Sequence, residues 1–319
     1  MAFFSKSFFT IALLLSLLSC TAHGQLSPNF YSNSCPNLES IVASVMSQIA
    51  SSDPSMAAAI LRLFFHDCFV NGCDASLLLD DGPVVSEKRA PPNLSVRGYE
   101  VIDAIKLRVE AACRGQVSCA DILALAARDS VSLLGGPSWS VPLGRTDSTS
   151  ASLNVDLPGP DSNIGGLIKA FADKGLDARD LTALSGAHTI GQATCDIFRN
   201  RIYNDANIDP NYAFLRRQTC PMGAGPNFNL APLDASSPTR FDNAYYKNLV
   251  DRKGLLHSDQ ELFNNGPTDW LVRLYSSNPV AFANDFANAM VKVGNLSPST
   301  GWSGIRRSNC RSVNFSSRY

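Results

Sequence analysis

Apolar residues recur every three or four positions along most of the chain, which is the spacing of one face of an α-helix. Asp53-Pro54 and Ser258-Asp259 supply helix start signals, and Gly254 and Gly294 stand where helices should end. The pattern predicts helices over 38–50, 56–69, 101–113, 119–134, 165–174, 177–184, 189–203, 242–253, 259–263 and 278–293. Alternating strand patterns are scarce, so we expect an all-α fold with at most short β-hairpins.

The segment 135–163 is rich in Gly, Pro and Ser and indicates a seam between two halves. The 319 residues suffice for one large domain or two ordinary ones. A hydrophobic fraction of 45% with only 17% charged residues excludes a disordered chain. With 27 basic against 28 acidic residues the net charge is −1, which argues against a nucleic-acid or polybasic membrane surface.

The first 24 residues have the features of a secretory signal peptide. One basic residue, Lys6, precedes an apolar run over 8–18. The small residues Ala22 and Gly24 then stand three positions and one position before the expected cleavage point. The run is shorter than the roughly 20 residues that span a bilayer. A buried N-terminal helix is the alternative, but the small-residue pattern disfavours it. We expect an exported mature chain that begins at Gln25, which could cyclise to pyroglutamate.

Nine cysteines are present, and Cys20 would leave with the signal peptide. An even number remaining in an oxidising compartment predicts four disulfides, although the sequence cannot choose among the pairings. No Cys-x2-Cys pair exists, so a zinc site is disfavoured. Glycosylation sequons occur at Asn93, Asn295 and Asn314, and Pro298 should hinder the second of these.

Three histidines remain after Gln25: His66, His188 and His257. Arg62 and His66 are four residues apart on a predicted helix and therefore share one face. The arginine stays charged, so a neighbouring histidine should be neutral and able to act as a base. Spacing alone favours a buried structural histidine, with the catalytic base as the alternative.

Side chains with oxygen atoms that could bind a metal ion follow His66 directly in the sequence. Asp67, Asp74 and Ser76 lie within ten residues, Gly72 allows a tight turn, and backbone carbonyls could complete a Ca²⁺ shell. An ordinary acidic turn is the alternative. A Cys68–Cys73 bridge would mainly hold the shape of this loop.

A second cluster, residues 184–191, places His188 between small residues. Without a second histidine or cysteine nearby, His188 suits an axial haem ligand better than a zinc site. A structural histidine at a helix end is the alternative. Residues 234–242 again space oxygen donors closely and could hold another hard cation.

These segments resemble a known family. Residues 61–76 are similar to the distal signature of secreted plant (class III) haem peroxidases, and residues 184–191 to their proximal signature. The likeness covers essentially the whole mature chain, with all eight of its cysteines in family order. Further matches are Glu87-Lys88, Pro92-Asn93, Arg97-Gly98, 117–122, 135–139, Gly144-Arg145 and 258–263.

The resemblance implies the plant haem-peroxidase fold, in which distal and proximal helical halves enclose one haem b. The distal half would comprise about 25–160 plus the C-terminal end, and the proximal half about 161–304. His188 would be the axial iron ligand, with Asp259 accepting a hydrogen bond from its other ring nitrogen.

On the opposite face of the haem, His66 would move the proton of hydrogen peroxide while Arg62 stabilises developing charge. Asn93 would orient His66, and Glu87 would support Asn93. The remaining implied positions are Phe65 above the haem, which restricts access to the iron, and Pro158 near the haem edge, where small phenolic donors are oxidised in one-electron steps.

The resemblance also implies two Ca²⁺ sites and a disulfide pattern. The distal site would use Asp67, Val70, Gly72, Asp74 and Ser76, and the proximal site Thr189, Asp234, Ser237, Arg240 and Asp242. The bridges would be Cys35–Cys113, Cys68–Cys73, Cys119–Cys310 and Cys195–Cys220.

We therefore expect a secreted, monomeric haem peroxidase that removes hydrogen peroxide and oxidises cell-wall phenols, with no nucleic-acid or membrane partner. The vacuole is a less expected destination than the cell wall because only nine residues follow Cys310. Asn295 and Asn314 are the glycosylation candidates, while Asn93 should carry no glycan.

A catalytically quiet, calcium-stabilised wall-binding protein is the alternative. It has no chemical need for the complete set of Arg62, His66, Asn93, His188 and Asp259.

Overall fold

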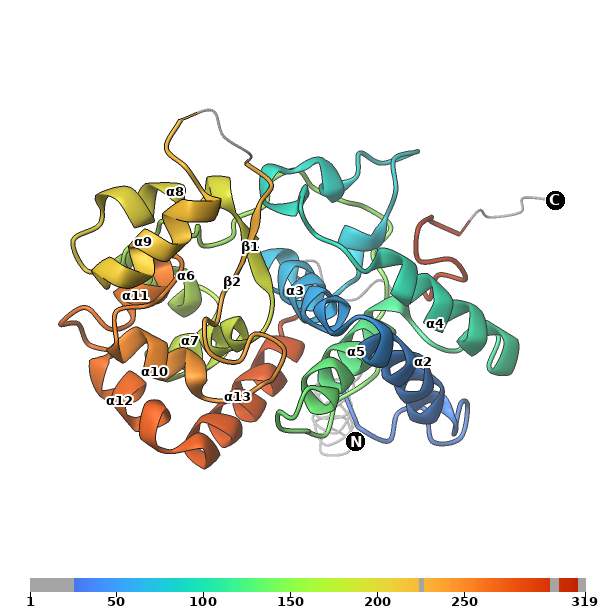
Figure 1. Ribbon diagram of the computed structural model, residues 1–319. Helices are drawn as coiled ribbons and strands as arrows, with labels where there is room; N and C mark the ends of the chain where they lie inside the picture. The colour runs from blue at the N-terminus through green and yellow to red at the C-terminus, as the bar shows by residue number, and fades with distance from the viewer. Residues whose placement is uncertain (1–25, 224–226, 299–303, 315–319) are drawn as a thin grey trace, which may run out of the picture.

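The computed structural model describes residues 26–223, 227–298 and 304–314 (Figure 1). The predicted signal peptide, residues 1–24, and the predicted pyroglutamate at Gln25 lie outside the described residues. Within them, none of the helices combines the length and the apolar character that crossing a membrane requires.

The described part of the chain is mostly helical, which confirms the expected fold class. Its α-helices are α2 (Leu38–Ser52), α3 (Pro54–Asn71), α4 (Tyr99–Ala112), α5 (Cys119–Leu133), α6 (Ile164–Ala172), α7 (Ala178–Ser185), α8 (Cys195–Asn204), α9 (Pro210–Thr219), α10 (Ala244–Val250), α11 (His257–Glu261), α12 (Asp269–Ser277) and α13 (Pro279–Gly294). The 3₁₀ turns are η1 (Ser76–Leu78), η2 (Glu87–Arg89), η3 (Pro91–Asn93) and η4 (Gly186–Thr189). The strands are β1 (Gln192–Thr194) and β2 (Leu230–Pro232).

Helices α2 to α5 pack against one another and form the first helical group (Figure 1). Helix α3 starts as the sequence predicts, because the Asp53 side chain accepts a hydrogen bond from Ser55 N at 2.9 Å and Pro54 follows at the first helical position. Ser118 caps α5 in the same way by accepting from Asp121 N. Most of α5 is buried, so this helix is the centre of the group.

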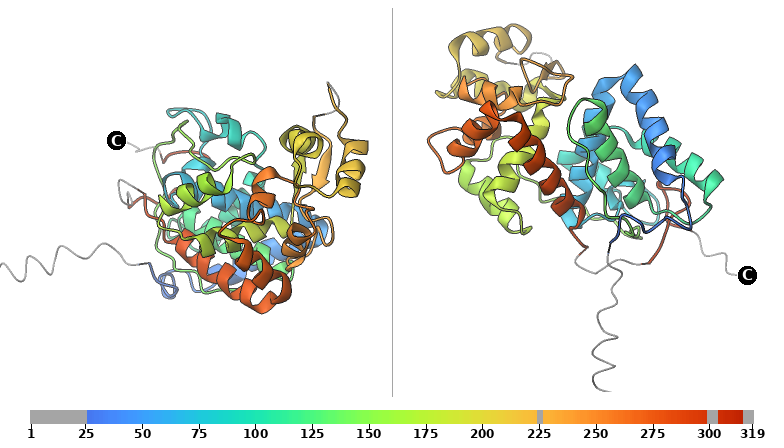
Figure 2. Two further views of the ribbon diagram at one scale, coloured as in Figure 1. Left: turned by 90° about the vertical axis from the view of Figure 1, so that its left-hand side faces the viewer. Right: turned by 90° about the horizontal axis from the view of Figure 1, so that it is seen from below.

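Helices α6, α7, α10, α12 and α13 form the second group. The right-hand view of Figure 2 shows it beside the first group. A capping box between Asp177 and Asp180 starts α7, and Lys292 of α13 binds Asp180 at 2.7 Å. The interior of this group is aromatic and contains Phe241, Tyr245, Tyr246, Tyr275, Phe282 and Phe286.

A third unit contains α8, α9 and the small sheet, and it has its own apolar cluster. Strands β1 and β2 pair antiparallel, with Ala193 opposite Ala231. The predicted single helix over 189–203 is therefore wrong in its first half: the chain forms η4, then β1, and becomes α-helical only at Cys195. The periodicity also failed to predict α9 and α12.

The first two groups meet along α3 and at the end of α13. Phe171 of α6 contacts Phe69 with ring centroids 4.9 Å apart, and Lys174 Nζ donates to the Val70 carbonyl at 2.7 Å. Arg145, fully buried in the connection after α5, donates to the Gly294 carbonyl and to Asp121 Oδ1 at 2.8 Å. One guanidinium thus joins the end of α13 to α5.

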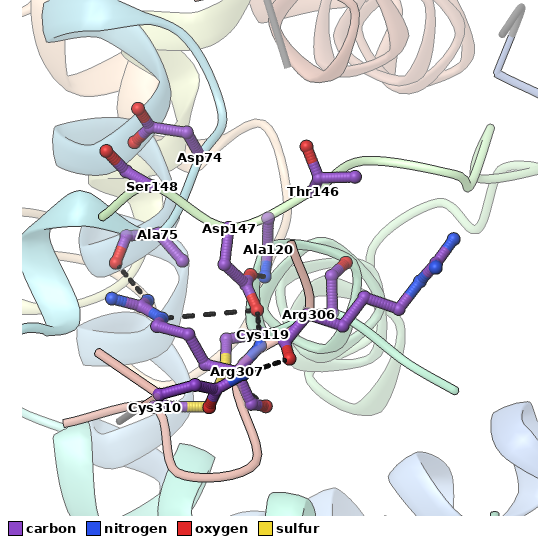
Figure 3. A network of polar contacts seen from close by, with 12 residues as sticks. Asp74, Ala75, Cys119, Ala120, Thr146, Asp147, Ser148, Arg306, Arg307 and Cys310 are labelled. Carbon is purple, nitrogen blue, oxygen red and sulfur yellow. Dashed lines mark hydrogen bonds and ion pairs between the residues drawn. A yellow bond between two sulfur atoms is a disulfide. The ribbon is translucent and has the colours of Figure 1, made fainter. Parts of the chain in front are cut away.

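The C-terminal segment returns to the first group, where a disulfide joins Cys310 to Cys119 (Figure 3). Arg307 is fully buried there, donates from Nη2 to the Ala75 carbonyl at 2.6 Å, and has its Nε 4.0 Å from Asp147. The backbone N–H of Arg307 also donates to Asp147 Oδ2 at 2.7 Å. The other disulfides are Cys35–Cys113, Cys68–Cys73 and Cys195–Cys220, so all four bridges are the ones that the resemblance implies.

Candidate active site

Helix α3 presents Arg62 and His66 on one face, as their spacing predicts, and the two side chains contact each other. Arg62 Nε donates to His66 Nε2 at 3.1 Å. Arg62 is held in turn by the Pro92 carbonyl at 3.1 Å and by Ser95 Oγ at 3.1 Å. Because a guanidinium can only donate, His66 Nε2 must carry a lone pair.

Asn93, at the end of η3, fixes the other nitrogen of His66. Its Oδ1 lies 2.7 Å from His66 Nδ1, while its Nδ2 donates to the Glu87 carbonyl at 2.9 Å. Because Nδ2 donates to the Glu87 carbonyl, the amide orientation is assigned, and Asn93 Oδ1 must accept a hydrogen bond from His66 Nδ1–H. The network therefore selects the neutral tautomer of His66, which carries its proton on Nδ1 and its basic lone pair on Nε2, where Arg62 donates.

Glu87 supports Asn93 through its backbone carbonyl, whereas its carboxylate accepts from Ser152 N at 3.0 Å. Nothing in the sequence indicates whether Glu87 acts through its backbone or through its side chain. Burial raises the pKa of the Glu87 carboxyl.

The surroundings of His66 disfavour its charged form. Its pKa is lowered to about 4, first by burial and then by the charge of Arg62, while the hydrogen bond to Asn93 acts in the opposite direction. Phe65, the neighbour of His66, packs on Phe69 with ring centroids 4.8 Å apart and has a stacked contact with Phe171.

His188 lies in η4, directly after α7. Its Nδ1 donates to Asp259 Oδ1 at 2.7 Å, and its side chain is 38% exposed although its neighbour Thr189 is fully buried. Space here requires a small residue, because a Cβ at Gly186 would lie 2.3 Å from Tyr246 Oη. An accessible imidazole whose Nδ1 is held by a carboxylate leaves Nε2 to bind a metal, so these residues fit an axial haem ligand.

Asp259, at the third position of α11, is 2% exposed and accepts three hydrogen bonds. Besides His188, these come from Leu256 N to Oδ2 at 3.0 Å and from Tyr245 Oη to Oδ1 at 2.9 Å. Burial and then the charge of Asp259 raise the pKa of Tyr245, so its phenol keeps its proton. Tyr245 is not among the predicted site residues, since nothing in the sequence pattern places α10 against α11.

The predicted distal calcium residues lie in the last turns of α3, which contain Asp67 and Val70, and in the segment that follows the helix. Asp67 and Asp74 are buried; Asp67 accepts from Ala75 N and Asp74 from Ser76 N. Burial raises the pKa of both carboxyls, and the charge of Asp74 raises that of Asp67 further. A bound divalent cation would offset the free-energy cost of keeping both buried carboxylates charged, so the donor set fits calcium.

One predicted distal ligand has a competing contact, because the Val70 carbonyl accepts from Lys174 Nζ. A carbonyl oxygen has two lone pairs, so this contact still leaves Val70 able to bind a cation.

The predicted proximal calcium residues also lie together. Thr189 Oγ1 donates to Asp234 Oδ2 at 2.9 Å and lies 3.4 Å from the Arg240 carbonyl, and Ser237 Oγ donates to Asp242 Oδ1 at 2.9 Å. Across the described residues no three His, Cys, Asp or Glu side chains are grouped to hold a metal. Both sets therefore depend on hydroxyl and carbonyl oxygens as well as carboxylates.

Other predicted positions fall in varied surroundings. Asn93 is 2% exposed, whereas Asn295 and Asn314 are exposed. Pro158 is half-buried in the connection between α5 and α6. The side chain of His257 is partly exposed, and its Nδ1 lies 2.7 Å from Asp205 Oδ2.

The sequence matches the family model described as peroxidase over residues 42–278. Peroxidase 67 of Arabidopsis thaliana is 54% identical over 95% of this chain and 98% of its own length. The lignin-forming anionic peroxidase of Nicotiana sylvestris is 54% identical over 98% of both chains, and peroxidase P7 of Brassica rapa subsp. rapa is 56% identical over 91% of this chain and its whole length. These matches, with two imidazoles whose Nδ1 atoms are fixed by Asn93 and Asp259, show that the chain belongs to the plant class III haem peroxidases.

Proposed function

We propose that this peroxidase binds one haem b with His188 as axial iron ligand and uses His66 and Arg62 on the opposite face of the haem. The observation that carries the proposal is the matched pair of imidazoles. Each has Nδ1 anchored on a side-chain oxygen, and they come from two different helical groups. Bound haem would supply the iron and the redox chemistry.

The chain's own residues manage the proton. His66 takes a proton from hydrogen peroxide at Nε2 and later returns it to the departing oxygen. Its low pKa keeps it unprotonated before the reaction, and Asn93 holds Nδ1–H so that Nε2 faces the substrate. Arg62, which contacts Nε2, stabilises negative charge as the O–O bond breaks.

At His188, Asp259 accepts the hydrogen bond from Nδ1–H and makes this imidazole more electron-rich than a free one. Phe65 restricts approach to the iron, which directs small phenolic donors to the haem edge near Pro158. The name of the Nicotiana sylvestris relative, a lignin-forming peroxidase, supports phenols as donors.

Two bound Ca²⁺ ions would hold the loops that adjoin the histidines. Asp67 follows His66 and Thr189 follows His188, so each ion would stabilise one side of the haem pocket. The protein would act as a secreted monomer in the cell wall. All the relatives named above are peroxidases, and nothing favours a catalytically quiet wall-binding protein.

Reconstitution with hemin tests the proposal. The wild type should show a Soret band and peroxide-dependent oxidation of guaiacol. His66→Ala should keep the band and lose about 10²- to 10⁴-fold in the rate of reaction with peroxide, as expected for a lost acid–base group. His188→Ala should lose the band. A wild type without a Soret band, or His66→Ala with normal turnover, would refute the assignment.

A further inference from the structure

Tyr245 shares an acceptor atom with His188. Its Oη donates to Asp259 Oδ1 at 2.9 Å, and His188 Nδ1 donates to the same oxygen at 2.7 Å. The Tyr245 ring also stands edge-on to the His188 imidazole, with ring centroids 6.2 Å apart and planes at 86°. Tyr245 is 1% exposed, so no solvent competes for its hydroxyl.

Two donors on one carboxylate oxygen compete for its electron density. The phenol spreads part of the negative charge of Oδ1 towards itself, which weakens the acceptor that His188 meets. The Leu256 N–H donates to Oδ2, so a rotation of the carboxylate that turned this oxygen to His188 would move it away from Leu256. The strength of the His188–Asp259 hydrogen bond thus depends on a third residue.

We propose that Tyr245 is a positioning residue that sets how strongly Asp259 polarises His188, and thereby how much electron density His188 gives to bound iron. The inference rests on the proposed function, because it concerns the ligand assigned there. It adds a residue from α10 to a pair formed by η4 and α11.

The adjacent residue supplies a matched control. Tyr246 is as deeply buried as Tyr245, but its Oη donates to the Thr182 carbonyl at 2.8 Å and to the Ala183 carbonyl at 3.3 Å. Tyr245→Phe and Tyr246→Phe each remove one buried phenol oxygen from α10. Only Tyr245→Phe removes a donor from Asp259.

The experiment has one readout without haem and two with it. In the apoprotein, proton NMR of the ¹⁵N-labelled histidines should show the His188 Nδ1–H resonance moving downfield in Tyr245→Phe. In the hemin-loaded protein, the Fe–His stretching band should rise in frequency and the Fe(III)/Fe(II) midpoint potential should fall. Tyr246→Phe should match the wild type in all three. Replacing Tyr245 by 3-fluorotyrosine keeps its shape with a stronger donor, so every shift should reverse; this substitution also serves if Tyr245→Phe fails to fold.

Two failures are distinguishable. A wild type that takes up hemin and shows an Fe–His band, with Tyr245→Phe or the fluorotyrosine protein unshifted, overturns the inference and leaves the proposed function standing. Equal shifts in Tyr245→Phe and Tyr246→Phe also overturn it, since they indicate a general loosening of α10. A wild type that binds no haem refutes the proposed function and the inference together.

Discussion

His66 is surrounded by groups that keep it neutral. Burial and the Arg62 charge lower its pKa to about 4, against about 6.5 for a free imidazole. Between these two values the unfolded chain binds a proton that the folded protein does not, so the contribution of His66 to stability falls as the pH drops from about 6.5 towards 4. Catalysis has the same lower limit, because only the unprotonated ring can accept the proton of peroxide.

The pH dependence of the reaction with peroxide tests this at the residue scale. In the wild type the second-order rate constant should stay level from neutral pH down to about 5 and halve near pH 4. Arg62→Leu removes a positive charge beside Nε2, so its midpoint should move upward while staying below about 6.5, since burial remains. Stopped-flow mixing with hydrogen peroxide from neutral pH down to about pH 4 measures the midpoints of the wild type and of Arg62→Leu. An unmoved midpoint in Arg62→Leu would contradict the electrostatic account.

Some contacts of these residues can be predicted from the sequence and others cannot. The four-residue spacing of Arg62 and His66 predicted their contact, because helix geometry is local. Asn93 lies 27 residues from His66, and only the family resemblance suggested the pairing. Tyr245 and Tyr246 are adjacent and chemically identical, so only the packing of α10 shows which of them reaches Asp259.

The secondary-structure elements likewise depend on contacts between residues that are distant in the sequence. The apolar spacing over 189–203 is compatible with one helix, but β1 pairs with β2, some 40 residues further on, and periodicity does not detect such pairing. Helix α9 had a usable signal: Asp209-Pro210 repeats the Asp-Pro start of α3, and Asp209 accepts from Tyr212 N at 2.7 Å.

Gly72, which ends α3, provides a test at the scale of elements. Its φ is +95°, and an added Cβ would lie 2.5 Å from the backbone of Ser297 and Pro298. Gly72→Ala should therefore lower the free energy of unfolding by about 2–5 kcal/mol, from backbone strain plus overpacking. Gly115 has φ +70° and open space around it, so Gly115→Ala should cost only about 1–2 kcal/mol. Urea unfolding compares the two, and equal losses would show that the contact with 297–298 is unimportant.

At the scale of the whole molecule, two buried arginines hold distant segments together. Arg145 joins α5 to the end of α13, and Arg307 joins the C-terminal segment to the loop after α3. Each guanidinium donates to a backbone carbonyl and also faces a carboxylate. Each therefore holds a distant backbone segment in place and balances a buried negative charge. Arg145 belongs to a segment that matches the family, but nothing in the sequence indicates that either arginine is buried.

Arg307 has a neighbour that serves as its control. Arg307 is fully buried between Asp147 and the Ala75 carbonyl, whereas the Arg306 side chain points away from this network (Figure 3). The Arg306 guanidinium lies over the Phe30 ring. Arg307→Leu removes the cation that faces the buried Asp147, and removing one partner of a buried ion pair costs about 3–5 kcal/mol. Arg306→Leu removes the same charge from the same segment and should cost about 1 kcal/mol or less.

Chemical unfolding with the Cys119–Cys310 disulfide intact measures both variants. The bridge already holds Cys310 at α5, so any large loss in Arg307→Leu reports the ion pair rather than detachment of the C-terminus. Burial raises the pKa of Asp147 and the charge of Arg307 lowers it, so without Arg307 this carboxyl should bind a proton more readily. The deficit of Arg307→Leu should therefore shrink as the pH is lowered. A deficit independent of pH, or equal in the two variants, would show that Arg307 contributes packing alone.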